Sequence, residues 1–183
     1  MFNAFLGRVY VALISLSTLV LSNYTGNSPR FTDIFIEIVD NGIYIRCFLE
    51  DAFENDFKEI FDSGILVSVT YELEIIAKNS LITQKSFTNT AIWEFENRHW
   101  LLYLGEDNIF TTIENFEELK QSLSFVETFL YFDTINFDSV NLNISARLPT
   151  IHFTTLQKSF DLMIFWKLRE PKEKININLR GSK

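Results

Sequence analysis

A chain of 183 residues, of which 47% are hydrophobic, can form one domain with a core and is too short for us to expect two. Its net charge of −8 opposes contact with a phosphate backbone, which excludes nucleic acid as the expected partner. The single cysteine, Cys47, excludes an intrachain disulfide framework, and its place in the apolar phase of a predicted strand indicates a buried thiol.

The first residues have the layout of an export signal. Arg8 is their single positive charge, and an uncharged run from Val9 to Leu21 follows it. This run is shorter than the roughly 20 residues of a membrane span, although counting from Phe2 leaves a retained anchor as the alternative. We expect the protein to be exported, and to be either periplasmic or anchored to the inner membrane by its N-terminus.

The domain organisation follows from this pattern. We expect residues 1–22 to be a signal peptide or an N-terminal membrane anchor, residues 23–30 to be a linker, and residues 31–180 to form a single α+β domain. Membrane contact would run through residues 1–22 if they are not cleaved.

The folded part begins with a predicted hairpin. Ile34, Ile36 and Ile38 share one phase of "FTDIFIEIVD", and Ile43, Ile45, Cys47 and Leu49 share one phase of "IYIRCFLE". Asn41-Gly42 between the two runs is typical of a tight turn.

A short amphipathic helix is predicted next. Asp51 and Glu54 have the spacing of a capping box, apolar residues recur at helical spacing, and Ser63-Gly64 ends the pattern. The apolar positions are Phe53, Phe57, Ile60 and Phe61. The acidic residues Glu50, Asp51, Glu54, Asp56, Glu59 and Asp62 lie largely off that stripe. A calcium loop would need its oxygen ligands at alternating loop positions, so we interpret these acids as the solvated face of a helix and not as a site.

The clearest strand runs from Ile65 to Ala77, where alternate residues are apolar and Ser68, Thr70, Glu72 and Glu74 lie in the other phase. One apolar and one polar face indicate an antiparallel sheet that is wet on one side. Further strands are predicted at about 84–96 and 100–104, with turns near "ENRH" and "GEDN".

A second helix is predicted after Thr111 and Glu114, which again have capping-box spacing. Its apolar positions are Phe116, Leu119, Leu123, Val126 and Leu130. Residues 140–148 then alternate as a strand that Pro149 closes.

The C-terminal part is mixed. "TLQKSFDLMIFWKL" fits a third helix through Leu156, Phe160, Met163 and Phe165, or a strand at its aromatic end, and we prefer the helix. Alternation in "KININLR" predicts an edge strand. The expected fold is therefore α+β: an antiparallel, twisted sheet of about six to seven strands with two or three amphipathic helices packed on one face.

The order and spacing of these elements resemble a family of uncharacterised exported bacterial proteins, the domain of unknown function numbered four-three-nine-zero. The likeness is carried by "DNGIYIRCFLEDAFENDFKEIFDSGILVSVTYELEI", by Trp93 in "AIWEFENRHW", and by "ARLPTIHF" before the aromatic stretch around Trp166. It covers about residues 31 to 170. The resemblance implies export and this fold, and it implies no activity, cofactor or substrate.

Few residues have the spacing that catalysis or metal binding requires. His99 and His152 lack the close spacing of a zinc motif, and Cys47 in an apolar phase predicts an inert thiol. Nucleotide-binding and nucleophile-elbow glycine motifs are absent from the sequence. Glu72 and Glu74 share a strand face and are the first pair to test for sugar hydrolysis, but we interpret them as solvated residues of a half-wet strand.

We therefore expect no catalytic, cofactor-binding or metal-binding residues, and no enzyme. The nineteen phenylalanines favour a non-enzymatic exported or envelope-anchored interaction or structural module that binds an envelope protein through a sheet face or edge. The alternative is a carrier for an acyl chain or other apolar ligand in a cavity between sheet and helices.

Overall fold

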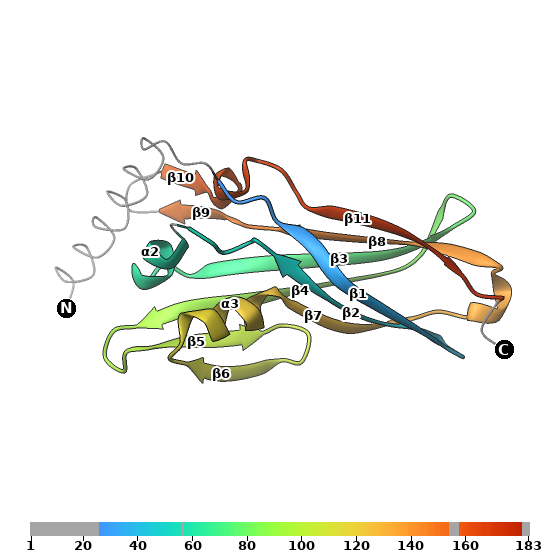
Figure 1. Cartoon of the computed structure of the whole chain (residues 1–183), viewed down its shortest axis with the longest axis horizontal. Helices are drawn as coiled ribbons and strands as arrows, with labels where there is room; N and C mark the ends of the chain where they lie inside the picture. Colours follow the sequence, from blue (N-terminus) through green and yellow to red (C-terminus); the bar gives the residue numbers. More distant parts are fainter. Residues whose placement is uncertain (1–25, 56, 154–157, 181–183) are drawn as a thin grey trace.

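The structure is a computed structural model that describes residues 26–55, 57–153 and 158–180. The predicted signal peptide or anchor, residues 1–22, lies outside the described residues. Most of the described chain forms antiparallel sheet, as predicted, but the larger part of it is divided between two sheets with one lying over the other (Figure 1).

Three strands form the smaller sheet, in the order β1-β2-β7: β1 (Arg30–Val39), β2 (Gly42–Glu50) and β7 (Phe125–Tyr131). Six strands form the larger sheet, in the order β11-β8-β3-β4-β5-β6: β11 (Lys172–Asn178), β8 (Ser139–Arg147), β3 (Val67–Ala77), β4 (Ser80–Glu94), β5 (His99–Leu104) and β6 (Ile109–Ile113). A separate hairpin pairs β9 (Thr150–Phe153) with β10 (Lys158–Asp161). The helical elements are α2 (Phe57–Asp62), α3 (Phe116–Ser124), and the 3-10 turns η1 (Thr134–Asn136) and η3 (Leu162–Trp166).

The core lies between the two sheets. The apolar phase of β3, from Val67 to Ala77, is at most 3% exposed, and so is the apolar phase of β2 from Ile43 to Leu49. Side chains at alternate positions of a strand point to opposite faces, so the two apolar phases meet in the core and the other phases form the outer faces of the two sheets. This confirms that β3 has one buried and one solvent-facing side, as predicted.

The expected arrangement of one sheet covered by two or three helices is wrong, because a second sheet covers much of the first. α3 ends at Ser124, and the next residues pair with β2 as strand β7. Val126 and Leu130, predicted as helix positions, are buried on the inner face of that strand. A spacing of four residues fits a helix and also fits one face of a strand, and aromatic and β-branched neighbours favour the strand.

The start of each helix also differs from the predicted capping box. Asn115 caps α3: its side-chain oxygen accepts hydrogen bonds from the backbone N–H groups of Glu117 (2.8 Å) and Glu118 (3.3 Å). Thr111 lies in β6, where it pairs with Leu102. Asp51 has a left-handed φ of 57°, whereas a capping residue is extended, and α2 begins at Phe57, beyond the predicted cap.

The expected third helix is replaced by strand β10 followed by the turn η3. The side chain of Asp161 accepts from the Met163 N–H (2.9 Å) and so begins that turn. Leu156 lies outside the described residues. The predicted edge strand near the C-terminus is confirmed as β11, in which Ile175 pairs with Leu142 of β8.

The predicted first hairpin is confirmed, with its turn one residue earlier. Val39 pairs with Gly42, so Asp40 and Asn41 form the turn. Gly42 lies inside the sheet, where an added Cβ would be 2.1 Å from the carbonyl oxygen of Leu130. The glycine therefore allows β7 to approach β2 closely.

The start of the described chain is held against the domain. The backbone N–H of Asn27 donates to the Phe165 carbonyl (2.8 Å), and its side-chain amide donates to the Ala52 carbonyl (3.3 Å). Asn27 is only 3% exposed. This part of the expected linker, residues 23–30, therefore packs on the folded unit.

Candidate functional site

The outer face of the three-stranded sheet carries an unusual number of aromatic side chains. These are Phe35, Tyr44, Phe48, Phe125, Phe129 and Tyr131, which we call the aromatic face. All six are exposed or half-buried, and Tyr131 is 66% and Phe35 45% exposed. Large apolar groups of this kind on an outer sheet surface mark a binding surface more often than single exposed residues do.

Strand alternation and register place these rings together. β2 buries Ile43, Ile45, Cys47 and Leu49, so its other phase points outward. Phe48 lies opposite Phe125, with ring centroids 5.0 Å apart, and Tyr44 lies opposite Phe129. Phe129 also contacts Tyr131 at 4.3 Å between ring centroids.

Sequence reasoning missed this surface because it assigned the residues of β7 to a helix. The alternation of Phe125, Phe129 and Tyr131 with buried Val126 and Leu130 was the available signal.

Polar groups occupy the middle of the aromatic face. The Arg46 guanidinium lies 5.4 Å from the centroid of the Phe35 ring, a cation–π geometry. Arg46 lies opposite Glu127, whose carboxylate accepts a hydrogen bond from the Tyr44 hydroxyl. That hydrogen bond is the main cause of a raised pKa for the Tyr44 hydroxyl.

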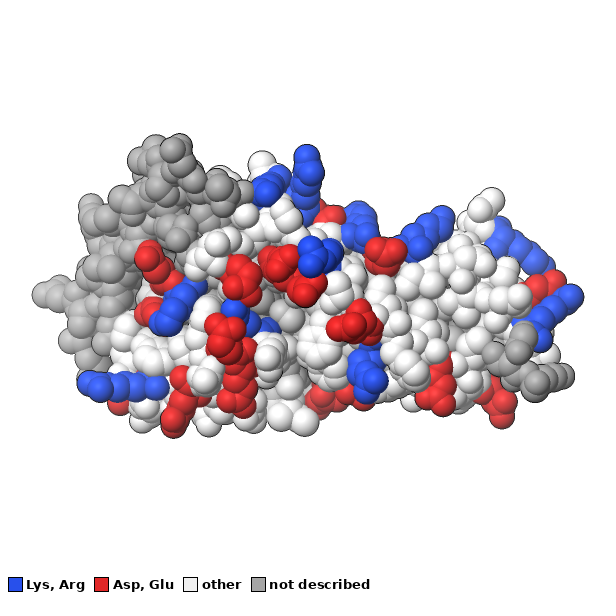
Figure 2. Space-filling model, viewed as in Figure 1, with Lys and Arg blue, Asp and Glu red and all other residues white. Residues whose placement is uncertain are grey.

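An acidic groove of about 490 Å³ adjoins the aromatic face at Phe48. It lies where the ends of β1 and β2 approach α3, and its lining includes Asp33, Glu50, Asp51, Glu54, Glu117 and Lys120. Figure 2 shows acidic side chains gathered over this region, with a less charged stretch along the rest of the three-stranded sheet.

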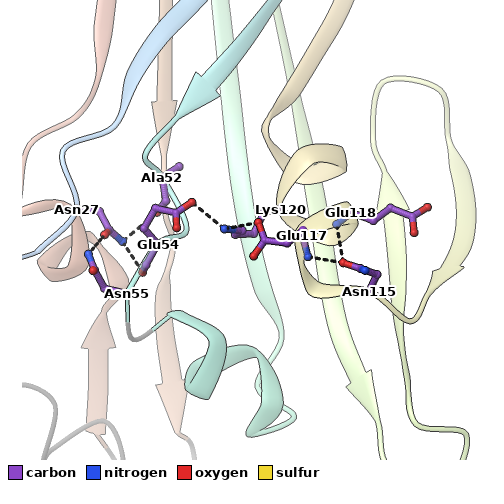
Figure 3. A network of polar contacts seen from close by, with 8 residues as sticks. All are labelled: Asn27, Ala52, Glu54, Asn55, Asn115, Glu117, Glu118 and Lys120. Carbon is purple, nitrogen blue, oxygen red and sulfur yellow. Dashed lines mark hydrogen bonds and ion pairs between the residues drawn. The ribbon is translucent and has the colours of Figure 1, made fainter.

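Lys120 is the central cation of the acidic groove (Figure 3). Its side chain is 13% exposed, and its ammonium group is 2.8 Å from a carboxylate oxygen of Glu54 and 2.8 Å from one of Glu117. Partial burial alone would lower the pKa of Lys120, but hydrogen bonds to Glu117 and Glu54 outweigh it, and the pKa is raised. Both carboxylates are at least half exposed, so this pairing adds little stability and mainly orients α3 against the segment after β2.

The acids predicted as a solvated helix face fall into two groups. Glu50, Asp51 and Glu54 line the acidic groove, and Arg30 pairs with Glu50 (2.6 Å) and with Asp51 (3.1 Å). Glu59 is exposed on α2, and Asp62 pairs with Lys58. Asp56 lies outside the described residues.

Glu72 and Glu74 lie far from these surfaces, on the outer face of the six-stranded sheet. Asn143 of β8 donates a hydrogen bond to Glu74 (3.3 Å), and both glutamates line a groove with Lys172 and Lys174. Glu72 is exposed and Glu74 is half-buried, as expected for residues on the solvent-facing side of a strand.

The remaining candidates for chemistry lie apart from one another. Cys47 is fully buried, and burial raises the pKa of its thiol to about 12. His99 pairs with Glu94 (2.9 Å), and His152 is exposed in β9. Among the described residues, no cluster of three or more His, Cys, Asp or Glu could hold a metal ion. Within the same part of the chain, no helix is long and apolar enough to span a membrane.

The chain matches no protein-family model, and neither a curated protein nor a solved structure matches it.

Proposed function

We propose that this protein is a non-enzymatic, exported or envelope-anchored interaction module that binds a partner protein through the aromatic face. The observation that carries the proposal is the grouping of six aromatic side chains around Arg46 on one outer sheet surface. Tyr, Phe and Arg are enriched at protein interfaces, where rigid rings provide contact area at low entropic cost.

Charge favours a protein over the other large partners. The net charge of −8 opposes nucleic acid and anionic lipid, and five carboxylates line the groove beside the aromatic face. A protein surface can supply both apolar and basic side chains, which would suit the two adjoining surfaces.

A carrier for an apolar ligand is the second candidate, with its cavity between helices and sheet. That space is occupied by packed rings: Phe53 contacts Phe57 at 5.4 Å, Phe61 at 5.7 Å and Trp166 at 6.3 Å between ring centroids. The indole N–H of Trp166 also donates to the Ala52 carbonyl (2.8 Å). This packing supports a structural role for the phenylalanines and weakens the carrier hypothesis.

Site-specific photocrosslinking in the native cells tests the proposal. A crosslinking amino acid replaces Phe35 or Tyr131 in the full chain, and matched controls replace Leu81 or Ile109, which are also about half exposed but lie in the other sheet. We expect one discrete protein adduct from the aromatic face, absent from both controls. Adducts of equal yield from all four positions, or a chain recovered only as a free monomer, would contradict the proposal.

A further inference from the structure

The outer edge of β1 has no paired strand within the described part of the chain, where β1 pairs only with β2. A bulge at Asp33-Ile34, opposite Cys47, interrupts the start of the strand, and the register is regular from Phe35 to Val39. Bulges of this kind restrict where an edge can pair, which leaves residues 35–39 as the segment with regular free backbone groups.

The inner side chains next to this edge are incompletely covered. Ile34, Ile36 and Ile38 point toward the core but are only half-buried, whereas their β2 neighbours Ile43 and Ile45 are fully buried. β1 contacts β11 of the other sheet (Figure 1). In β11, Ile175 is also half-buried. Apolar side chains of one further strand would complete this margin of the core.

The charges along the same edge define what that strand should carry on its outer face. Asp33, Glu37 and Asp40 are all exposed, and Asp33 also lines the acidic groove. A second copy of this chain would bring its own Glu37 against the first, and like charges on neighbouring strands are destabilising. Lysine or arginine on the added strand would instead face carboxylates and the Phe35 ring.

We propose that the β1 edge over residues 35–39 binds an extended segment of a partner protein in which apolar residues alternate with lysine or arginine. The apolar side chains would lie beside Ile36 and Ile38, and the basic side chains beside Glu37. Backbone hydrogen bonds provide the affinity in this mode of binding, and the alternation provides the specificity. The inference rests on the proposed function and names the chemistry of the bound segment.

The test uses a labelled peptide of about ten residues that alternates isoleucine with lysine, long enough for one strand. Two control peptides replace every lysine by glutamate, or keep the composition but group the isoleucines and lysines in two blocks. Fluorescence anisotropy with the full chain measures affinity, and amide hydrogen exchange measures protection in β1. We expect binding of the alternating basic peptide alone, slower exchange within residues 35–39, and weaker binding at higher salt.

A charge reversal at the centre of the edge provides the second measurement. Glu37→Lys should weaken binding of the basic peptide about tenfold, because an exposed attraction is lost and a repulsion of similar size replaces it. Glu96→Lys makes the same charge change at an exposed position in the β4–β5 turn and should leave binding unchanged. Circular dichroism of both variants checks that they fold.

The outcomes separate this inference from the proposed function. Equal binding of the block peptide, equal weakening by both variants, or unchanged exchange in β1 would overturn it. If the chain instead pairs with a second copy through β1, a photocrosslinking amino acid placed at position 37 will join two identical chains. That result would also show the inference to be wrong. In each case the adducts formed at Tyr131 would still report on the proposed function.

Discussion

Replacing Tyr71 by phenylalanine tests the contact between β3 and the last turn of α3. Tyr71 is fully buried on the inner face of β3, and its hydroxyl donates a 2.7 Å hydrogen bond to the carbonyl of Leu123. Leu123 lies in the last turn of α3, where carbonyl groups have no partner within the helix. The hydroxyl therefore satisfies a helix end from the neighbouring sheet.

The Tyr71→Phe variant keeps the ring and leaves that buried carbonyl unpaired. An unsatisfied buried acceptor costs about 1–3 kcal/mol, so we expect the free energy of unfolding to fall by about 2 kcal/mol. With an m-value of about 2 kcal/mol/M in urea, the unfolding midpoint should fall by about 1 M at unchanged m.

Tyr103→Phe is the matched control for this measurement. Tyr103 is half-buried, and its hydroxyl donates to the exposed side chain of Asn108 (3.1 Å). Water can replace that partner, so the loss should stay within about 0.5 kcal/mol. If urea unfolding followed by tryptophan fluorescence gave the same midpoint for both variants, the hydrogen bond from Tyr71 would not hold α3 to the sheet.

Two further changes test the close approach of β7 and the buried thiol. Gly42→Ala places a Cβ against the Leu130 carbonyl oxygen and should cost about 3 kcal/mol in urea unfolding; a stability equal to the wild type would contradict the tight β2–β7 packing. The pKa of the Cys47 thiol is raised from 9.0 to about 12, so only the unfolded state ionises between these values, and stability falls as pH rises. Relative to Cys47→Ala, the free energy of unfolding should fall by about 1 kcal/mol from pH 9 to pH 10, whereas parallel pH curves would show a thiol that ionises in the folded state.

The strands with the longest alternation could be predicted from sequence. In β3 and β8 the apolar phase runs without interruption, and side chains at alternate positions must face opposite sides of a strand. This local geometry is sufficient to identify a dry and a wet face. It also predicted the first hairpin, because two alternating runs joined by a short polar turn have few other arrangements.

The candidate site could not be predicted in the same way, because its parts come from distant positions. Tyr44 and Glu127 are 83 residues apart, and Lys120 and Glu54 are 66 apart. Their meeting depends on the pairing of β2 with β7 and on where α3 ends. Neither event is visible in one local pattern.

The amino-acid sequence by itself specifies alternating strands with apolar faces, a place for Cys47 in an apolar strand phase and an acidic surface, since these properties follow from local side-chain chemistry. The long-range pairing of residues 125–131 with β2 determines that the phenylalanine-rich segment is a strand and that a second sheet exists. A spacing of four residues fits a helix face and a strand face equally, so only the gain from pairing with another strand separates them. The aromatic face is a product of that pairing.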